Sequence, residues 1–219
     1  MYALDNRLMK HVDLLMERYP VLTPCKQNII DAYLIMEKAY ISDGKLLIAG
    51  NGGSAADSEH MAGELMKRFR VARPVSREFA KKLIGIDQVR GRNLAKNLEY
   101  GLMAIPLVAH EALTTAYIND VDGRGVFAQQ LFGYGRPGDV FLGISTSGNS
   151  ENIMNAAVVA RAMRIKVIGL TGSGGGKLAV NADVSVRVPG TETYMVQELH
   201  LPVYHCWCLM LEERFFGKN

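Results

Sequence analysis

A short stretch rich in hydroxyl groups follows an apolar run in the second half of the chain. Residues 143–150 read Gly-Ile-Ser-Thr-Ser-Gly-Asn-Ser, and they come directly after Val140-Phe141-Leu142. This pattern predicts a buried strand that ends in a turn, with a helix beginning at Glu151. The free N–H groups of a helix start, joined by small hydroxyls, can hold a phosphate. A simple Ser/Thr helix cap is the alternative, and the absence of a Walker lysine argues against a nucleoside triphosphate with magnesium.

A second small-residue loop, Gly50-Asn51-Gly52-Gly53-Ser54, follows the apolar run that starts at Lys45. Its glycines allow a tight turn, and Ser54 can cap the next helix or bind a ligand. Because ligands of an open parallel sheet bind beyond the carboxyl ends of the strands, two such loops together indicate an anion site better than either does alone.

Four further polar residues lie on predicted helices. His60 and Glu64 are four residues apart and share one helix face, which suits a metal site, an acid/base pair or a surface pair that stabilises the helix. Gln197 and His205 are separated by about 80° around the axis and about 12 Å along it. Spacing alone does not make them a joint site, and Pro202 between them is expected to bend the helix.

The apolar runs alternate with helical patterns along most of the chain. This alternation predicts a parallel sheet covered on both faces by helices. The predicted strands are 45–50, 105–109, 140–144, 166–170 and 184–188. The predicted terminal helices are 8–18, 24–42 with Thr23 as N-cap and Pro24 in its first turn, and 192–216.

Composition narrows the class of protein. The chain has 219 residues, 48% of them hydrophobic, which suits one α/β domain, residues 1–219. No signal-peptide or membrane-spanning pattern is visible, and three cysteines without paired spacing indicate a reducing cytoplasm. A net charge of +3 is compatible with an anionic small molecule and too weak to indicate nucleic acid.

Taken together, the two loops, Leu170-Thr-Gly172, Gly175-Gly-Lys177 and Gln197-Glu-x-His200 occur in the order found in sugar isomerase (SIS) domain proteins. The chain resembles that family over about residues 25–215, and most closely its phosphoheptose isomerase group. The resemblance implies a five-stranded parallel sheet in a three-layer α/β/α sandwich, a flavodoxin-like arrangement. It also implies aldose–ketose isomerisation of sedoheptulose 7-phosphate through an enediol, a phosphorylated sugar as partner, and a homotetramer with active sites at subunit interfaces.

The resemblance also assigns roles to individual residues. Zinc-dependent members hold one zinc ion with four side chains, which correspond here to His60, Glu64, Gln197 and His205. Glu64 and His205 also correspond to the proposed acid/base pair. The positions that correspond to phosphate or sugar contacts are Asn51, Gly52, Gly53, Ser54, Arg68, Asn119, Asp120, Ser145, Thr146, Ser147, Ser150 and Gln197.

The chain departs from the family pattern in two places. The segment 70–115 is longer than usual and predicts a helical insertion, either an extra solvated helix or a lid or interface element. Tyr194 and Met195 replace an Asp and an Arg of the family pattern. Two alternatives to the heptose isomerase therefore stay open: an enzyme acting on a different sugar phosphate, and a sugar-phosphate-binding or regulatory protein without catalysis.

Overall fold

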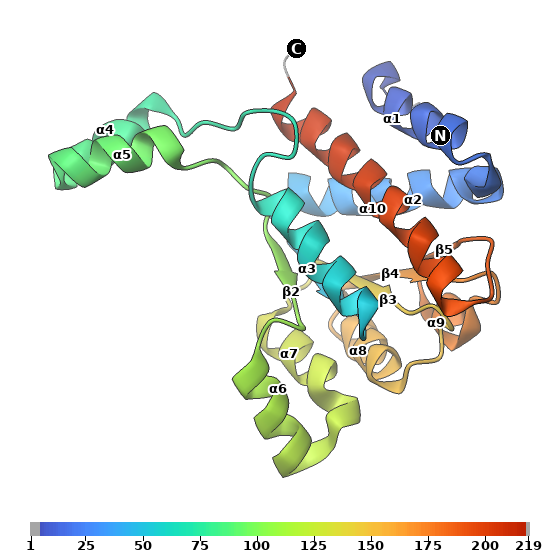
Figure 1. The fold of residues 1–219 in the computed structure, drawn as a ribbon. Coiled ribbons are helices and arrows are strands. Elements are labelled where there is room, and N and C mark those ends of the chain that lie inside the picture. The colour runs from blue at the N-terminus through green and yellow to red at the C-terminus, as the bar shows by residue number, and fades with distance from the viewer. Residues whose placement is uncertain (1–4, 218–219) are drawn as a thin grey trace.

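A parallel sheet of five strands forms the centre of the molecule (Figure 1). The computed structural model describes residues 5–217. The strands lie in the order β2-β1-β3-β4-β5. Their bounds are β1 Leu46–Ala49, β2 Ala104–Pro106, β3 Val140–Ile144, β4 Lys166–Thr171 and β5 Val184–Arg187. The predicted parallel α/β fold is confirmed, and the strands begin and end within about two residues of their predicted ranges, except that β2 ends three residues earlier than predicted.

The strand order reverses between β1 and β3. From β1 the chain crosses to β2 at one edge, then returns to β3 on the other side of β1. Ala49, the last residue of β1, is in register with Gly143 of β3. The loops that follow these two strands therefore lie side by side at the switch point, which is where ligands bind in open α/β sheets.

Helices cover both faces of the sheet. On one face α1, α2, α3 and α10 enclose the larger apolar core, and on the other α7, α8 and α9 enclose the smaller one. The α-helices are α1 Asn6–Arg18, α2 Lys26–Ile41, α3 Gly53–Met66, α4 Arg77–Ile86, α5 Gln88–Asn97, α6 Glu111–Tyr117, α7 Val126–Tyr134, α8 Glu151–Ala162, α9 Gly176–Asn181 and α10 Thr193–Phe216. Short helical turns complete the chain: η1 Pro20–Cys25, η2 Ile118–Asp122 and η3 Gly123–Gly125.

The helix α10 packs along α1, α2 and α3. Its side chain Trp207 is fully buried, and the indole Nε1 donates to the carbonyl of Ile29 on α2 at 2.9 Å. Pro202 lies inside α10 without ending it. Because this helix is anchored by a large buried aromatic side chain, its polar residues are held at fixed positions beside α3.

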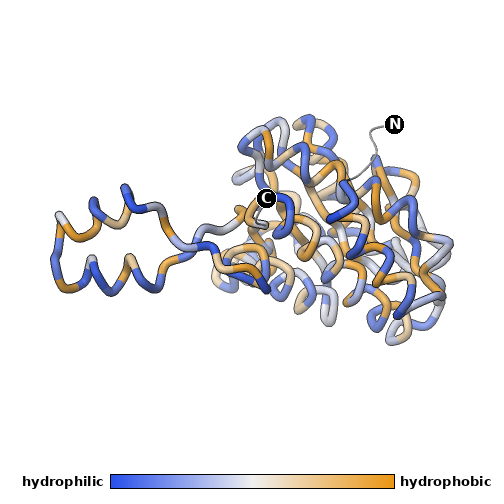
Figure 2. Tube along the Cα trace, turned by 90° about the horizontal axis from the view of Figure 1, so that it is seen from above, coloured by the Kyte–Doolittle hydropathy of each residue, from blue (hydrophilic) through white to orange (hydrophobic). Residues whose placement is uncertain are grey.

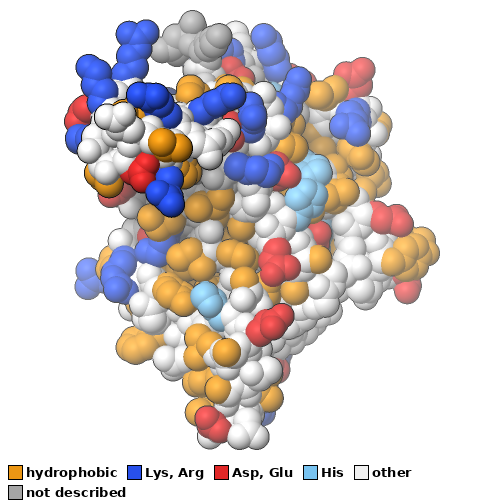
Figure 3. Space-filling view, turned by 60° about the vertical axis from the view of Figure 1, so that its left-hand side comes forward, with side chains coloured by type: hydrophobic (Ala, Val, Ile, Leu, Met, Phe, Trp, Pro, Cys, Tyr) orange, Lys and Arg blue, Asp and Glu red, His pale blue; other side chains and the backbone are white. Residues whose placement is uncertain are grey.

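Residues 77–97, the helices α4 and α5, form an arm that extends away from the sheet (Figure 2). The two helices contact each other far more than any other element. Apolar side chains remain exposed on the arm, with Ile86 at 87% and Val89 at 81%. In Figure 3, where this side comes forward, Lys and Arg side chains gather over the upper part of the face. The segment 70–115 is thus helical over much of its length, while its role stays a prediction.

One local prediction was wrong, and one of two alternatives left open for Ser54 is excluded. Thr23 and Pro24 lie in the short turn η1, and α2 begins at Lys26. The Thr23 hydroxyl donates to the carbonyl of Pro20 and caps no α-helix. The N-cap of α3 is Gly52, and no side chain caps this helix, so Ser54 does not have the capping role. No helix within residues 5–217 is long and apolar enough to cross a membrane.

Candidate functional site

The hydroxyl-rich loop connects β3 to the start of α8. Ser145 is buried, and its Oγ lies 3.0 Å from the Oγ of Ser150, the N-cap residue of α8. Ser150 makes no side-chain capping hydrogen bond to the helix. Ser147 is exposed, and its Oγ accepts from the backbone N–H of Asn149. The hydroxyls therefore surround the positive end of α8, as an anion site requires.

The tight turn of this loop depends on Gly148. It has a φ of +67°, and a Cβ at this position would lie 2.0 Å from the carbonyl oxygen of Gly175. Only glycine allows the loop after β3 to approach the loop after β4 this closely. The approach is reinforced by Asn149, whose Oδ1 accepts from the N–H of Lys177.

A reciprocal amide pair joins the loop after β1 to α8. The Nδ2 of Asn51 donates to the Oδ1 of Asn152 at 3.0 Å, and the Nδ2 of Asn152 donates back at 2.8 Å. The structure thus brings the two predicted loops together. Asn152 was missed from the sequence, because an asparagine in the first turn of a helix carries no signal of its own.

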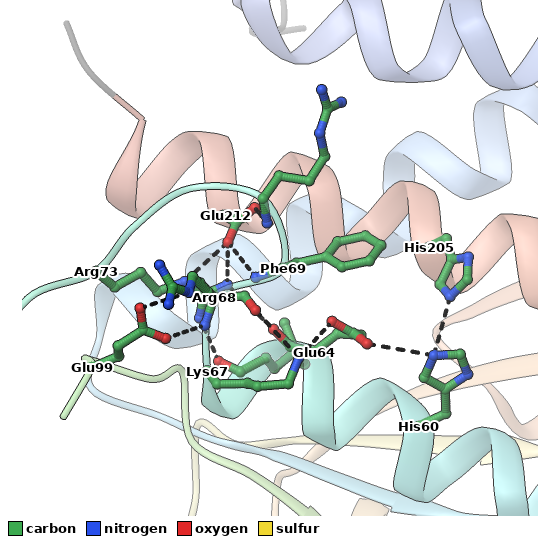
Figure 4. Close-up of polar contacts among 11 residues, drawn as sticks. His60, Glu64, Lys67, Arg68, Phe69, Arg73, Glu99, His205 and Glu212 are labelled. Atoms are coloured by element: carbon green, nitrogen blue, oxygen red, sulfur yellow. Dashed lines mark hydrogen bonds and ion pairs between the residues drawn. The ribbon is translucent and has the colours of Figure 1, made fainter. Parts of the chain in front are cut away.

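Three of the four side chains expected to bind metal come together between α3 and α10 (Figure 4). The Nε2 of His60 lies 3.5 Å from Oε1 of Glu64 and 3.5 Å from Nε2 of His205. The predicted shared face of His60 and Glu64 is therefore confirmed. His205 joins them because α3 and α10 run side by side in the same direction (Figure 1).

Gln197 lies near the N-terminal ends of the same two helices. A Cβ added to Gly53 would be 2.5 Å from the Nε2 of Gln197, so this amide packs on the first turn of α3. Since His60 is seven residues farther along α3, Gln197 is about two helical turns from the histidines. It lies instead beside the loop after β1.

Arg68 points toward the base of the arm. Its Nε lies 3.2 Å from the Oε1 of Glu99, and its N–H donates to the other carboxylate oxygen. The basic side chain nearest to Glu64 is instead that of Lys67, whose Nζ lies 3.2 Å from Oε2 (Figure 4). Lys67 was not predicted from the sequence.

Asn119 and Asp120 lie in the short helical turn η2 after α6. Both are exposed, and the amide of Asn119 donates to the carboxylate of Asp120 at 2.9 Å. Within residues 5–217, neither is linked by a hydrogen bond or ion pair to the His60 group or to the hydroxyl loop. Their predicted contact with substrate stays a prediction.

A buried tyrosine and a carboxylate lie behind His60. The hydroxyl of Tyr204 is 3.0 Å from Nδ1 of His60 and 3.2 Å from Oδ1 of Asp57. Tyr204 is fully buried, and its ring meets that of His60 edge-on. Neither residue was predicted, because a tyrosine on an apolar helix face reads as core.

Burial changes the acid–base properties of this group. It lowers the pKa of His205, with the neighbouring His60 adding to the effect. Burial also raises the pKa of Asp57 and of Tyr204. At pH 7 the imidazole of His205 is therefore neutral, and the phenol of Tyr204 keeps its proton.

The donor types around His60 are those that zinc takes, and part of the geometry fits. Ligands about 2.0–2.2 Å from a tetrahedral zinc lie about 3.3–3.5 Å from one another. The separations from His60 to Glu64 and to His205 agree with that spacing. Even so, no group of three or more His, Cys, Asp and Glu side chains within the described residues is arranged to hold a metal ion.

Comparisons with known proteins agree with this architecture. The SIS domain family model matches residues 88–172. Phosphoheptose isomerase 2 of Campylobacter jejuni is 38% identical over 191 residues, which are 87% of this chain and 82% of the relative. Phosphoheptose isomerase of Rhodospirillum rubrum is 35% identical over 88% of both chains.

Two solved structures of phosphoheptose isomerases are similar to this chain in both sequence and fold. Phosphoheptose isomerase from Neisseria gonorrhoeae superposes with a TM-score of 0.72 at 31% identity, covering 96% of this chain and all of that one. The Francisella tularensis enzyme has a TM-score of 0.70 at 30% identity, covering 85% and 86% of the two chains. On the sequence identity, the coverage and the shared fold, this chain belongs to the SIS-domain phosphoheptose isomerase family.

Proposed function

We propose that the protein is an aldose–ketose isomerase that interconverts sedoheptulose 7-phosphate and D-glycero-D-manno-heptose 7-phosphate. The observation that carries this proposal is the convergence of His60, Glu64 and His205, two of which lie on the helix that follows the loop 50–54, in a chain whose hydroxyl loop can hold an anion. The relatives named phosphoheptose isomerase support the choice of sugar phosphate.

The hydroxyl loop supplies binding energy at a distance from the reacting carbons. The phosphate is placed at the start of α8, where Ser145, Ser147 and Ser150 present hydroxyls beside the helix N–H groups. Thr146 lies in the same loop and is half-buried. Energy from this remote group can orient C1 and C2 of the sugar for proton transfer.

The proton transfers are assigned to Glu64 and His205. In the ketose-to-aldose direction, the Glu64 carboxylate removes a proton from C1, and the carbonyl electrons move onto O2 to give an enediolate. Neutral His205 then takes the proton from O1 and gives it to O2. Protonated Glu64 finally returns a proton to C2, and the aldehyde forms at C1.

We further propose zinc as the metal, with His60, Glu64 and His205 as ligands and Gln197 as the fourth. Zinc, when bound, polarises the carbonyl and stabilises negative charge on the sugar oxygens. Gln197 would need to move from its position against Gly53 to join the set. Coordination would lower the basicity of Glu64, so its carboxylate must be free of the metal when it takes the proton.

Assembly and location form part of the same proposal. The homotetramer implied by the family is supported by exposed apolar side chains such as Ile118 and Val121, at 53% and 66% exposure. Three buried cysteines without disulfides, Cys25, Cys206 and Cys208, support a reducing cytoplasm.

The test is hydrogen exchange at C1 and C2 of sedoheptulose 7-phosphate, followed by NMR in D₂O with and without added zinc. Deuterium incorporation with appearance of the aldose phosphate is expected, and zinc is expected to increase its rate. No exchange by folded, zinc-loaded protein would contradict the proposal.

A panel of sugar phosphates would then separate the alternatives. An isomerase for another sugar is favoured by one observation: Tyr194 and Met195, which replace two polar residues of the family pattern, are 57% and 45% exposed at the start of α10. Binding of several sugar phosphates without exchange in any would indicate a non-catalytic protein.

A further inference from the structure

The hydrogen bonds behind His60 have a single consistent direction. An ionised Asp57 can only accept, so the one proton of the Tyr204 hydroxyl goes to Oδ1 of Asp57, 3.2 Å away. The same hydroxyl oxygen, 3.0 Å from the ring, must then accept from Nδ1–H of His60. With its proton on Nδ1, a neutral imidazole has its lone pair on Nε2.

That lone pair lies close to a carboxylate oxygen and to a second imidazole nitrogen. The Nε2 of His60 is 3.5 Å from a carboxylate oxygen of Glu64 and 3.5 Å from Nε2 of His205. The lone pair can accept a hydrogen bond from an Nε2–H of His205 or bind a cation, and Glu64 and His205 offer further ligand atoms close to it. A chain of hydrogen bonds that begins at Asp57 thus ends in a cluster suited to a cation.

The residues that make these hydrogen bonds are held in place by the fold. Tyr204 is fully buried and is held on α10, while Asp57 and His60 are three residues apart on α3. The second oxygen of Asp57, Oδ2, is buried and has no hydrogen-bond partner within the described residues. The hydrogen bond from Tyr204 is therefore important for the carboxylate, which has little else to satisfy it.

We propose that Asp57 and Tyr204 are positioning residues: they hold His60 as the Nδ1–H tautomer, so that Nε2 is presented to a divalent cation shared with Glu64 and His205. This proposal rests on the proposed function, because that function identifies the site as a metal site. The His60 tautomer and the metal affinity can nevertheless be measured on the protein without substrate. Histidine ligands of metals are commonly oriented through the ring nitrogen that does not bind the metal.

The decisive variant is Tyr204→Phe, which keeps the buried ring and removes only the hydroxyl. Its matched control is Tyr40→Phe, which removes a hydroxyl that donates to the carbonyl of Met103 at 3.2 Å, away from His60. Asp57→Asn is the second variant and keeps the volume of the carboxylate.

Two measurements are made on each protein. Long-range ¹H–¹⁵N NMR of the metal-free protein at about pH 8, where an ordinary histidine is neutral, reports the His60 tautomer. Competition with a chromogenic chelator reports the dissociation constant for zinc alone. We expect Nδ1–H in the wild type and in Tyr40→Phe, loss of that preference in Tyr204→Phe, and zinc binding weakened roughly 10- to 100-fold in Tyr204→Phe.

Asp57→Asn is expected to weaken zinc binding in the same direction, and it carries the test if Tyr204→Phe does not fold. An Nε2–H tautomer in the wild type, or zinc affinity within about twofold of wild type in both variants, would overturn the proposal. These outcomes do not depend on turnover. A wild type that shows the tautomer and the affinity losses but does not isomerise sedoheptulose 7-phosphate would reject only the proposed function.

Discussion

Arg73 and Glu212 form an ion pair of 2.8 Å whose side chains are 0% and 1% exposed. The carboxylate of Glu212 also accepts from the backbone N–H groups of Phe69 and Arg70, while the guanidinium donates to the carbonyl of Leu65. One buried pair thus fastens the end of α3, and the segment that leads to the arm, onto α10.

Glu212→Gln is expected to reduce the free energy of unfolding by about 3–5 kcal/mol, because it leaves a buried arginine without its charge partner. Urea denaturation monitored by circular dichroism measures the change. Glu78→Gln is the matched control: it breaks an exposed pair with Lys82 on the arm and should cost less than about 1 kcal/mol. Equal effects of the two changes would contradict the structural importance of the buried pair.

Glu64→Gln is expected to abolish turnover while still permitting sugar-phosphate binding. The amide keeps the shape of the side chain but cannot take a proton from carbon. Turnover by NMR and affinity by isothermal titration separate the two effects. Turnover near the wild-type rate would exclude Glu64 as the base.

The double change Ser147→Ala and Ser150→Ala should weaken binding of a phosphate ester by a few kcal/mol at most, since a hydrogen bond to a charged group contributes about 1.5–3 kcal/mol. The affinities of the phosphorylated and unphosphorylated sugars are compared. An unchanged affinity for the phosphate ester would mean that the loop 145–150 does not hold the phosphate.

His200 makes stability depend on pH. The ring is fully buried, and burial lowers its pKa to about 4, although a contact with the backbone of Thr171 acts in the opposite direction. Between pH 6.5 and 4 the unfolded chain binds a proton at this residue and the folded chain does not. The free energy of unfolding therefore falls as the pH falls through this range, by up to about 3 kcal/mol from this group.

Denaturation of His200→Leu at several pH values tests the assignment. The variant should lose this part of the pH dependence and keep most of its stability at pH 7, because leucine is apolar and of similar size. A slope identical to that of the wild type would show that other groups cause the acid sensitivity.

Replacing residues 77–97 with a short Gly-Ser linker is expected to leave the sheet folded, because α4 and α5 contact mainly each other. The midpoint of thermal unfolding should change by a few degrees at most, corresponding to about 1 kcal/mol or less. Sedimentation analysis and the KM of the same variant distinguish the roles open for the arm, and an unchanged assembly with an unchanged KM would identify an extra solvated element. A smaller assembly would identify an interface element, whereas an intact assembly with a raised KM would identify a lid.

The sheet could be predicted from the sequence because most of its strands are short apolar runs, and the fifth, Val184–Arg187, alternates apolar and polar residues as a strand does. Val140–Ile144, buried at every position, is an example of the apolar runs. The start of α2 was misplaced because Pro24 is acceptable both in a first α-helical turn and in the 3₁₀ turn it occupies. Only tertiary packing distinguishes the two.

The site was predictable where its residues are close in sequence. His60 and Glu64 share a face by helical geometry, whereas the approach of His205 depends on how α10 packs on α3. The contact between Asp57 and Tyr204 joins residues 147 positions apart, so no local pattern could reveal it. Likewise, nothing in the spacing shows that Gln197 packs against Gly53.

The two ends of the arm lie next to each other. Pro74 and Glu99 form an antiparallel bridge, and the N–H of Tyr100 donates to the carbonyl of Arg73 at 2.8 Å. An insertion with joined ends can lengthen, shorten or be exchanged without altering the path of the chain on either side. We therefore expect length differences among relatives to concentrate here, and the turn at Asp87 to accept a fused tag or a second folded domain.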